Sequence, residues 1–220
     1  MKSLFLSSLL ALGLLAVPAQ AAEYPAKPIT LMTAFNAGGG SDVSHRLLEK
    51  FAKGVFDQPI VVTYKAGAGG EIGWTWLVGA KADGYTIGGV DLPHIVLQPM
   101  LRPEGQPCYK TEQLSPLCGL VYDADVVMVP EDGPYKTFKD LIEYAKANPG
   151  KVKVATVVKL TGDHLFLMQI EKLTGAKFTQ VPYSGSGKAI PALLSGEVDA
   201  YFGSGSSFLR MEKTRGLAIG

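Results

Sequence analysis

The chain has 220 residues, of which 47% are hydrophobic and 19% charged, with 21 basic and 20 acidic side chains. This length allows one domain or two small lobes, and the apolar content excludes a disordered chain. Lys2 carries the only charge among residues 1–21. Residues 22–220 are therefore neutral overall and lack the basic field that nucleic-acid binding requires, so we expect no nucleic-acid partner.

The first 21 residues have the pattern of an export signal. Met1 and Lys2 give a short positive end, residues 4–17 form an uncharged apolar run, and Ala19-Gln20-Ala21 matches an A-x-A cleavage site. The apolar run is shorter than the roughly 20 residues that span a bilayer. The pattern predicts a signal peptide cleaved after Ala21 and a periplasmic protein. An uncleaved anchor is the alternative.

The first half of the chain alternates short β-rich runs with helical patterns. Expected strands lie at residues 29–34, 60–64 and 86–90. Expected helices lie at residues 41–53 and 71–80. Such alternation predicts parallel βαβ units.

Residues 101–115 are rich in proline, glycine and glutamine and predict a linker, after which the alternation resumes. Expected strands lie at residues 117–121, 126–129, 152–156, 178–181, 198–202 and 217–219. Expected helices lie at residues 136–148, 162–174 and 188–195. The last strand-like run reaches the end of the chain without a cap, which suggests that a C-terminal return is missing.

Two glycine-rich turns, at residues 36–42 and 65–70, each follow a strand and open a helix. Backbone N–H groups at a helix N-terminus suit a carboxylate or phosphate, and glycine allows close approach. The alternative is a pair of tight βα turns with no ligand. Neither turn is a dinucleotide loop, because Val43 and Ile72 occupy the last position of G-x-G-x-x-G.

Several polar residues near expected helix starts are further candidates. Asp42 either caps its helix or receives a ligand ammonium, and Tyr183 either lines a site or packs locally. His164 follows Thr161 and Gly162 at a third helix start, where it could contact a ligand. A secreted hydrolase that uses a serine with His164 is an alternative function, although no G-x-S-x-G motif is present.

Cys108 and Cys118 are the two cysteines of the chain. Export would permit a disulfide between them, but spacing alone cannot show whether their Cα atoms come close enough. Two cysteines without a clustered histidine pair do not form a zinc site, and we expect neither a metal nor a cofactor.

The order of several short motifs carries a family resemblance. These motifs are residues 24–29 (YPAKPI), 38–42 (GGGSD), 67–70 (GAGG) with Ile72-Gly73, 83–86 (DGYT), 145–151 (AKANPGK), His164-Leu165, 181–183 (VPY) and 196–199 (GEVD). Together they resemble the solute-binding receptors of tripartite tricarboxylate transporters, the Bug family. The resemblance covers nearly all of residues 24–219.

The resemblance implies an α/β fold with parallel-rich sheets in a two-lobed periplasmic-binding-protein architecture, a type II-like Venus flytrap. Residues 22–120 would form the N-terminal part of lobe 1, residues 121–216 would form lobe 2, and residues 217–220 would start the return to lobe 1. The implied function is capture of a small carboxylate (a di- or tricarboxylate, an acidic amino acid or an aromatic acid) and its delivery to membrane permease subunits. No catalysis is implied, and we expect a monomer.

By position, the resemblance also implies a ligand site. It would comprise Phe35, Gly39, Gly40, Ser41, Asp42, Ala68, Gly69, Gly70, Thr161, Gly162, His164, Tyr183 and Ser204. The sequence departs from the family pattern at residues 157–160 (VVKL) and 203–206 (GSGS), so contacts from the second lobe could differ. The chain is also shorter than family members, which predicts an incomplete first lobe and leaves open a truncated fragment that does not bind.

Overall fold

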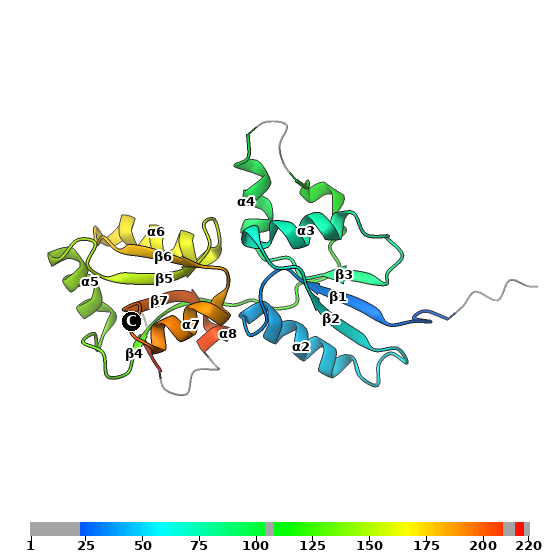
Figure 1. Ribbon diagram of the computed structural model, residues 1–220, viewed down its shortest axis with the longest axis horizontal. Coiled ribbons are helices and arrows are strands. Elements are labelled where there is room, and N and C mark those ends of the chain that lie inside the picture. The colour runs from blue at the N-terminus through cyan, green and yellow to red at the C-terminus, as the bar shows by residue number, and fades with distance from the viewer. Residues whose placement is uncertain (1–22, 104–107, 209–213, 218–220) are drawn as a thin grey trace, which may run out of the picture.

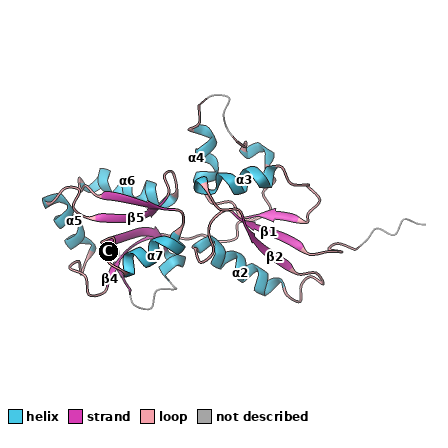
Figure 2. Ribbon diagram, in the orientation of Figure 1, coloured by secondary structure: helices cyan, strands magenta, loops and turns pink. Residues whose placement is uncertain are grey.

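The computed structural model describes residues 23–103, 108–208 and 214–217 and contains two β-sheets, each with helices on both faces (Figures 1 and 2). The first sheet consists of β1 (Ile29–Thr33), β2 (Ile60–Tyr64) and β3 (Thr86–Gly88) in the order β2-β1-β3. Both neighbours of β1 run parallel to it, with Ile29 opposite Ile60 and Thr30 opposite Thr86. The predicted parallel βαβ arrangement is confirmed for this half.

Alternating side chains of β1 explain why helices cover both faces of the first sheet. Ile29 and Leu31 point into a core shared with Ala52 of α2 (Gly40–Ala52), whereas Met32 packs with Trp74 of α3 (Glu71–Val78). Successive strand residues point to opposite faces, so one apolar strand supplies two cores. Figure 1 shows α2 and α3 on opposite sides of the sheet.

One residue of the region expected to be a linker, Tyr109, belongs to the core of the first sheet unit. Helix α4 (His94–Met100), which the sequence did not predict, packs against α3, and a 3₁₀ turn, η3, covers Thr111–Gln113. Tyr109 is 2% exposed, lies with its ring centroid 6.0 Å from that of Trp74, and donates a hydrogen bond to the Ile95 carbonyl. A buried aromatic anchor therefore fixes this segment to the first sheet.

The second sheet has five strands in the order β6-β5-β7-β4-β8. Its strands are β4 (Asp125–Pro130), β5 (Lys153–Val157), β6 (Thr179–Tyr183), β7 (Ala200–Ser204) and β8 (Thr214–Leu217). Its helices are α5 (Phe138–Ala147), α6 (Gly162–Thr174), α7 (Ser186–Leu194) and the short α8 (Gly205–Phe208). Strand β4 runs antiparallel to both of its neighbours, while β5 runs parallel to β6 and β7.

The middle residues of the central strands of the second sheet are buried. Val127 and Val129 pack with residues of α5 and α6 on one face, and Met128 packs with residues of α7 on the other. Helix α5 begins at a capping box, in which Thr137 accepts from the Asp140 backbone and Asp140 accepts from the Thr137 backbone. This pairing satisfies two otherwise unpaired donors.

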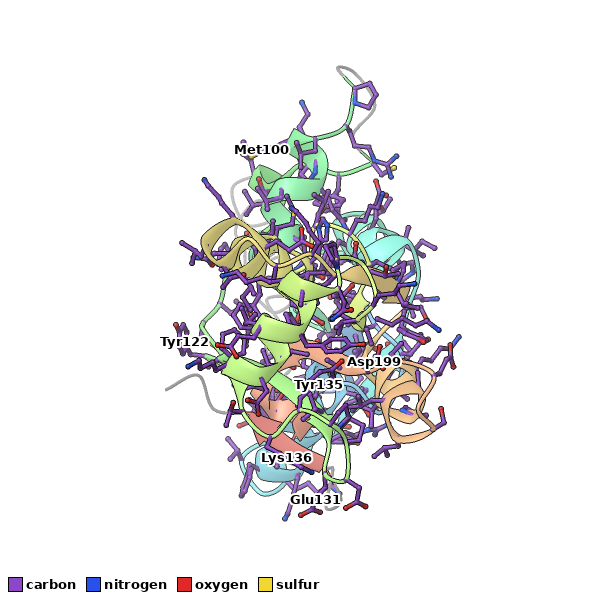
Figure 3. All side chains as sticks on the ribbon, turned by 90° about the vertical axis from the view of Figure 1, so that its left-hand side faces the viewer. Met100, Tyr122, Glu131, Tyr135, Lys136 and Asp199 are labelled. Atoms are coloured by element: carbon purple, nitrogen blue, oxygen red, sulfur yellow. The ribbon has the colours of Figure 1, made fainter. Side chains whose placement is uncertain are left out.

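The end of the second sheet farthest from the first sheet is held by structural contacts. Figure 3 shows Tyr135 beside Asp199 on this side of the molecule. Burial, and secondarily the Asp199 charge, raises the pKa of Tyr135 to about 12. The Asp199 carboxylate accepts from the Lys153 backbone, and the Lys136 ammonium donates to the Glu131 carbonyl. These groups are engaged within the fold and lie away from the junction of the two sheets.

One expected strand is wrong, and two further expectations fall wholly or partly outside the described residues. Residues 117–121 do not form a strand: they pair with no described strand, and Leu117 and Val121 are exposed. A strand is stabilised by backbone hydrogen bonds to a neighbouring strand, and this apolar run has no such neighbour. The strand expected at residues 217–219 overlaps β8 (Thr214–Leu217) at Leu217, and residues 218–220 lie outside the described residues. The predicted signal peptide, residues 1–21, also lies outside them.

The two cysteines are not bridged. Cys108 and Cys118 are both free and exposed, so the disulfide that export would permit is absent. Among the helices of the described residues, none is both long and apolar enough to cross a membrane.

Candidate functional site

The first glycine-rich turn opens α2 without a side-chain cap at its N-terminus. Gly39 occupies the N-cap position with extended φ/ψ angles of −89° and 177° and provides no side-chain cap. The first N–H groups of a helix have no partner within the helix and carry its positive dipole end. Asp42 is engaged locally, since its carboxylate accepts from Gly38 N (2.8 Å) and from the Tyr64 hydroxyl (2.7 Å).

The N-terminus of α7, from the second sheet, meets this turn. Gly40 N donates to the Ser186 hydroxyl at 3.3 Å, and Asn36 Nδ2 donates to the Ser184 hydroxyl at 3.0 Å. A Cβ atom on Gly187 would lie 2.8 Å from the Ala37 carbonyl oxygen, so the two backbones are in close contact. Two positive helix ends thus face each other across the junction, where Figure 1 shows α2, α7 and α8 together.

Further hydroxyl groups surround Gly40. A Cβ atom on Gly40 would lie 2.7 Å from Ser206 Oγ and 3.1 Å from Ser204 Oγ, and Ser204 Oγ lies 3.0 Å from Ser207 Oγ. The Asp123 carboxylate accepts from Ser206 N at 3.0 Å and so occupies the start of α8. The donors that line this position are therefore serine hydroxyls and the N-termini of α2 and α7.

The second glycine-rich turn has a conformation that requires glycine. Gly67, Gly69 and Gly70 have φ values of 135°, 67° and 96°. Gly70 lies against Trp74, whose ring atoms would be 2.6–2.9 Å from a Cβ there. The Gly69 carbonyl accepts from Gln98 Nε2 at 2.8 Å, which places α4 directly behind this turn.

The turn after β5 covers the second glycine-rich turn with apolar side chains. Val157 is 9% exposed and shares a core with Phe35 and Trp74, and Val158 packs against the same core. A Cβ on Gly69 would lie 2.9 Å from Val158 Cγ2. Leu160 has a φ of 71°, a strained value for a residue other than glycine. The two sheets therefore share one apolar cluster at this point.

The candidate residues at the start of α6 serve mainly to hold this turn. The Thr161 hydroxyl donates to the Val157 and Val158 carbonyls, and His164 Nδ1 accepts from Leu160 N at 3.2 Å. Burial, and secondarily the charge of Lys159, lowers the pKa of His164. Within the described residues, no serine is hydrogen-bonded to His164, so the serine–histidine pair of the hydrolase alternative has no geometric support.

Asp163 is a buried acid that sequence reasoning did not select. Its carboxylate accepts from Val157 N at 3.1 Å and lies 3.4 Å from the Tyr201 hydroxyl. Burial raises the pKa of Asp163 to about 7. A second acid, Asp91, accepts from the Ser41 hydroxyl at 2.8 Å, and burial raises its pKa as well.

The structure brings together only part of the predicted set. Gly39 and Gly40 lie against Ser186, and Ser204 lies against Gly40. Phe35 and Gly69 contact the turn after β5. The Tyr183 hydroxyl instead donates to Glu197, on the outer surface of the second sheet unit. Ser186 and Asn36 were not in the predicted set of site residues. Both could have been selected from the sequence, because Ser186 follows Gly185 at a helix start and Asn36 opens the first glycine-rich turn.

A metal centre has no support in the part of the chain that is described. No cluster of three or more histidine, cysteine, aspartate or glutamate side chains capable of holding a metal ion is present there. Two α/β units that meet at the carboxyl ends of their strands, with helix N-termini facing the junction, define the periplasmic-binding-protein class.

Comparison with known proteins narrows this class. The sequence model of one protein family, the tripartite tricarboxylate transporter family receptor (TctC), matches residues 44–218. The chain therefore belongs to this family. Protein BugT from Bordetella pertussis is 35% identical over 192 residues, which are 84% of this chain and 57% of BugT. The chain thus spans little more than half the length of this relative. The family and fold are those of periplasmic solute-binding receptors rather than enzymes.

Solved structures agree with this assignment. A structure described as a periplasmic transporter superposes with a TM-score of 0.77 at 30% identity, covering 89% of this chain and 66% of its own. MatC from Rhodopseudomonas palustris, solved with bound malate, superposes with a TM-score of 0.76 at 24% identity, covering 89% of this chain and 67% of its own. The two-lobed fold class expected from the sequence is confirmed.

Proposed function

We propose that the protein is an exported solute-binding receptor that captures a small carboxylate between its two sheet units and delivers it to the permease subunits of a tripartite tricarboxylate transporter. Residues 1–21 would direct export and be cleaved after Ala21. Residues 22–120 would then begin lobe 1 and residues 121–216 would form lobe 2. Family membership and the bound malate of MatC support a carboxylate ligand.

One observation carries the proposal: the N-termini of α2 and α7, from different sheets, meet at Gly40 and Ser186. Each helix end carries a partial positive charge, so an anion between them is favoured from both sides. Closure of the two units around the anion would exclude water and strengthen these contacts.

The first test is a thermal melt of the full chain with mono-, di- and tricarboxylates and with the corresponding amides. A ligand at 100 times its dissociation constant stabilises the fold by about 2.7 kcal/mol. We expect at least one acid to raise the melting temperature and its amide to have no effect. A melt that no acid shifts, or that acid and amide shift equally, would contradict the proposal.

A matched pair of variants then tests the Gly40 N–H. Gly40→Ala and Gly40→Pro both add a Cβ atom, but only proline removes the donor. Proline is tolerated at the first helical position, and the extended Gly39 is compatible with a following proline. We expect Gly40→Pro to bind the acid about tenfold more weakly than Gly40→Ala. Equal affinities would show that this N–H does not contact the ligand.

A further inference from the structure

We infer that capture of the carboxylate is coupled to the uptake of a proton by Asp163, through a chain of hydroxyl groups that ends at Ser186. This inference rests on the proposed function and describes how the same site is regulated. It makes Asp163 and Tyr201 positioning residues, because they set the direction in which the Ser186 hydroxyl donates.

A chain of polar side chains joins Asp163 to the junction of the two sheet units. The Tyr201 hydroxyl donates to Asp163 Oδ2 at 3.4 Å. The hydroxyls of Ser186 and Ser207 lie within hydrogen-bonding reach of the Tyr201 oxygen. Ser186 Oγ in turn accepts from Gly40 N, in the opposite unit, at 3.3 Å. All four side chains of the chain are buried, so water does not compete for these contacts.

The Tyr201 hydroxyl reaches Asp163 because a glycine lies beneath its ring. Tyr201 precedes Gly203 by two residues on β7, so both lie on the same face of the strand. A Cβ atom on Gly203 would lie 2.3 Å from both Cζ and the hydroxyl oxygen of Tyr201. A side chain at this position would therefore displace the ring and break the chain of hydroxyls.

The charge of Asp163 decides which way the hydroxyls donate. An ionised carboxylate only accepts, so Tyr201 donates to Asp163, Ser186 donates to Tyr201, and the Ser186 oxygen accepts from Gly40 N. A protonated Asp163 can donate to Tyr201, which then donates to Ser186 and leaves the Ser186 proton for the ligand. A ligand carboxylate has no proton to donate, so only the second arrangement gives it a donor at Ser186.

The surroundings of Asp163 favour proton uptake near neutral pH. Burial raises the pKa of Asp163 to about 7, and the charge of Asp125, on β4, adds to this rise. Tyr201 faces Asp163 from β7, and β5 contributes only the Val157 backbone N–H. A carboxylate that binds at Ser186 brings a further negative charge and so favours the protonated acid. The proton comes from the solvent, and ligand and proton strengthen each other's binding by the same factor.

The test is isothermal titration of the full chain with the acid that raises the melting temperature most in the carboxylate panel. Titrations at pH 6 and pH 8 lie on either side of the raised pKa of about 7. We expect the affinity to be about fivefold higher at the lower pH, which corresponds to a coupling of about tenfold. Near neutral pH, titrations in phosphate and in Tris, which differ in ionisation enthalpy, should show uptake of about half a proton per ligand bound.

Two variants separate the hydroxyl chain from a merely structural role. Asp163→Asn is neutral and can donate to Tyr201 as the protonated acid does. It should bind at least as tightly as the wild type does at the lower pH, with equal affinities at both pH values. Tyr201→Phe keeps the ring but interrupts the chain, so it should bind more weakly and also lose the pH dependence. Tyr135→Phe, which removes another buried tyrosine hydroxyl far from the junction, is the control and should behave as the wild type (Figure 3).

The outcomes distinguish this inference from the proposed function. Equal wild-type affinities at both pH values, or an Asp163→Asn variant that keeps the wild-type ratio or binds more weakly at both, overturn the inference and leave the carboxylate receptor standing. A pH dependence that Asp163→Asn abolishes but Tyr201→Phe retains overturns the role of the hydroxyl chain. A chain that no carboxylate stabilises overturns the proposed function, and the inference with it.

Discussion

The Tyr201 hydroxyl lies 3.4 Å from Oδ2 of Asp163, and both side chains are buried in the second sheet unit. The same carboxylate oxygen accepts a hydrogen bond from Val157 N, in the residue that begins the apolar cover of the second glycine-rich turn. The protonation state of Asp163 is therefore linked to the backbone next to the candidate site.

This link predicts a pH dependence of stability. Burial raises the pKa of Asp163 from 3.8 to about 7, so between these values the folded chain binds a proton that the unfolded chain does not. Stability contributed by this group is present at low pH and is lost as pH rises through this range. Relative to Asp163→Asn, the wild type should lose up to about 1.4 kcal/mol of unfolding free energy per pH unit.

The measurement is urea unfolding of the wild type and Asp163→Asn at several pH values between 4 and 7. The difference between the two curves removes the contribution of histidines, which both proteins share. Asp57→Asn, at an exposed position, controls for the loss of one carboxylate. Parallel profiles for the wild type and Asp163→Asn would show that Asp163 is ionised in both the folded and unfolded chains over this range.

A second prediction concerns the contact between Gly69 and Val158. Gly69→Ala places a Cβ 2.7 Å from Gln98 Nε2 and 2.9 Å from Val158 Cγ2 at a φ of 67°. Gly54→Ala, at a φ of 88°, meets nothing within 4 Å and isolates the cost of the positive φ. We expect Gly69→Ala to lower the unfolding free energy by about 1–3 kcal/mol more than Gly54→Ala.

Chemical unfolding of both glycine variants measures this difference. The double variant Gly69→Ala with Val158→Ala should recover part of the loss, because it removes one of the two clashing groups. Equal costs for Gly69→Ala and Gly54→Ala would mean that the two sheet units do not meet at Gly69 in solution.

A third prediction concerns the free thiols. Cys108 and Cys118 are exposed and unbridged, so the native chain should react with two equivalents of a disulfide reagent such as Ellman's reagent without prior reduction. A hydrogen bond to Glu71, and secondarily the charge of that group, raises the pKa of Cys108. Cys108 should therefore react more slowly than an ordinary exposed thiol, because the thiolate is the reactive form. Cys118→Ser should leave one slow thiol, and a native chain without free thiols would indicate a bridge.

Local sequence patterns predicted most of the elements because each is encoded within a few residues. The strand Ile60–Tyr64 and the helix Gly162–Thr174 have the predicted bounds. Helix α4 was missed because Pro93 precedes it and Pro99 lies within it, and both residues indicate a turn. The prediction of a strand at residues 117–121 was wrong because strand formation depends on a neighbouring strand, and a local sequence pattern does not show whether one is present.

The candidate site was predictable only in part for the same reason. The glycine-rich turns were recognisable because glycine, a preceding strand and a following helix adjoin in sequence. The contact between Gly40 and Ser186 joins residues 146 positions apart, and neither segment alone indicates the other. The apolar cover at Val157 and Val158 was noted only as a departure from the family pattern, and its packing against Phe35 required the fold.

The position of β4 has a mechanical consequence. Within the described residues, the chain crosses between the two sheet units once, through residues 114–124, and then enters β4, which has hydrogen-bonded neighbours on both edges. A force that separates the units along the chain would load these two ladders in shear, where many hydrogen bonds must break together. Once the contacts between the units are broken, residues 114–124, which belong to no helix or strand, would therefore extend before β4 is pulled from its sheet.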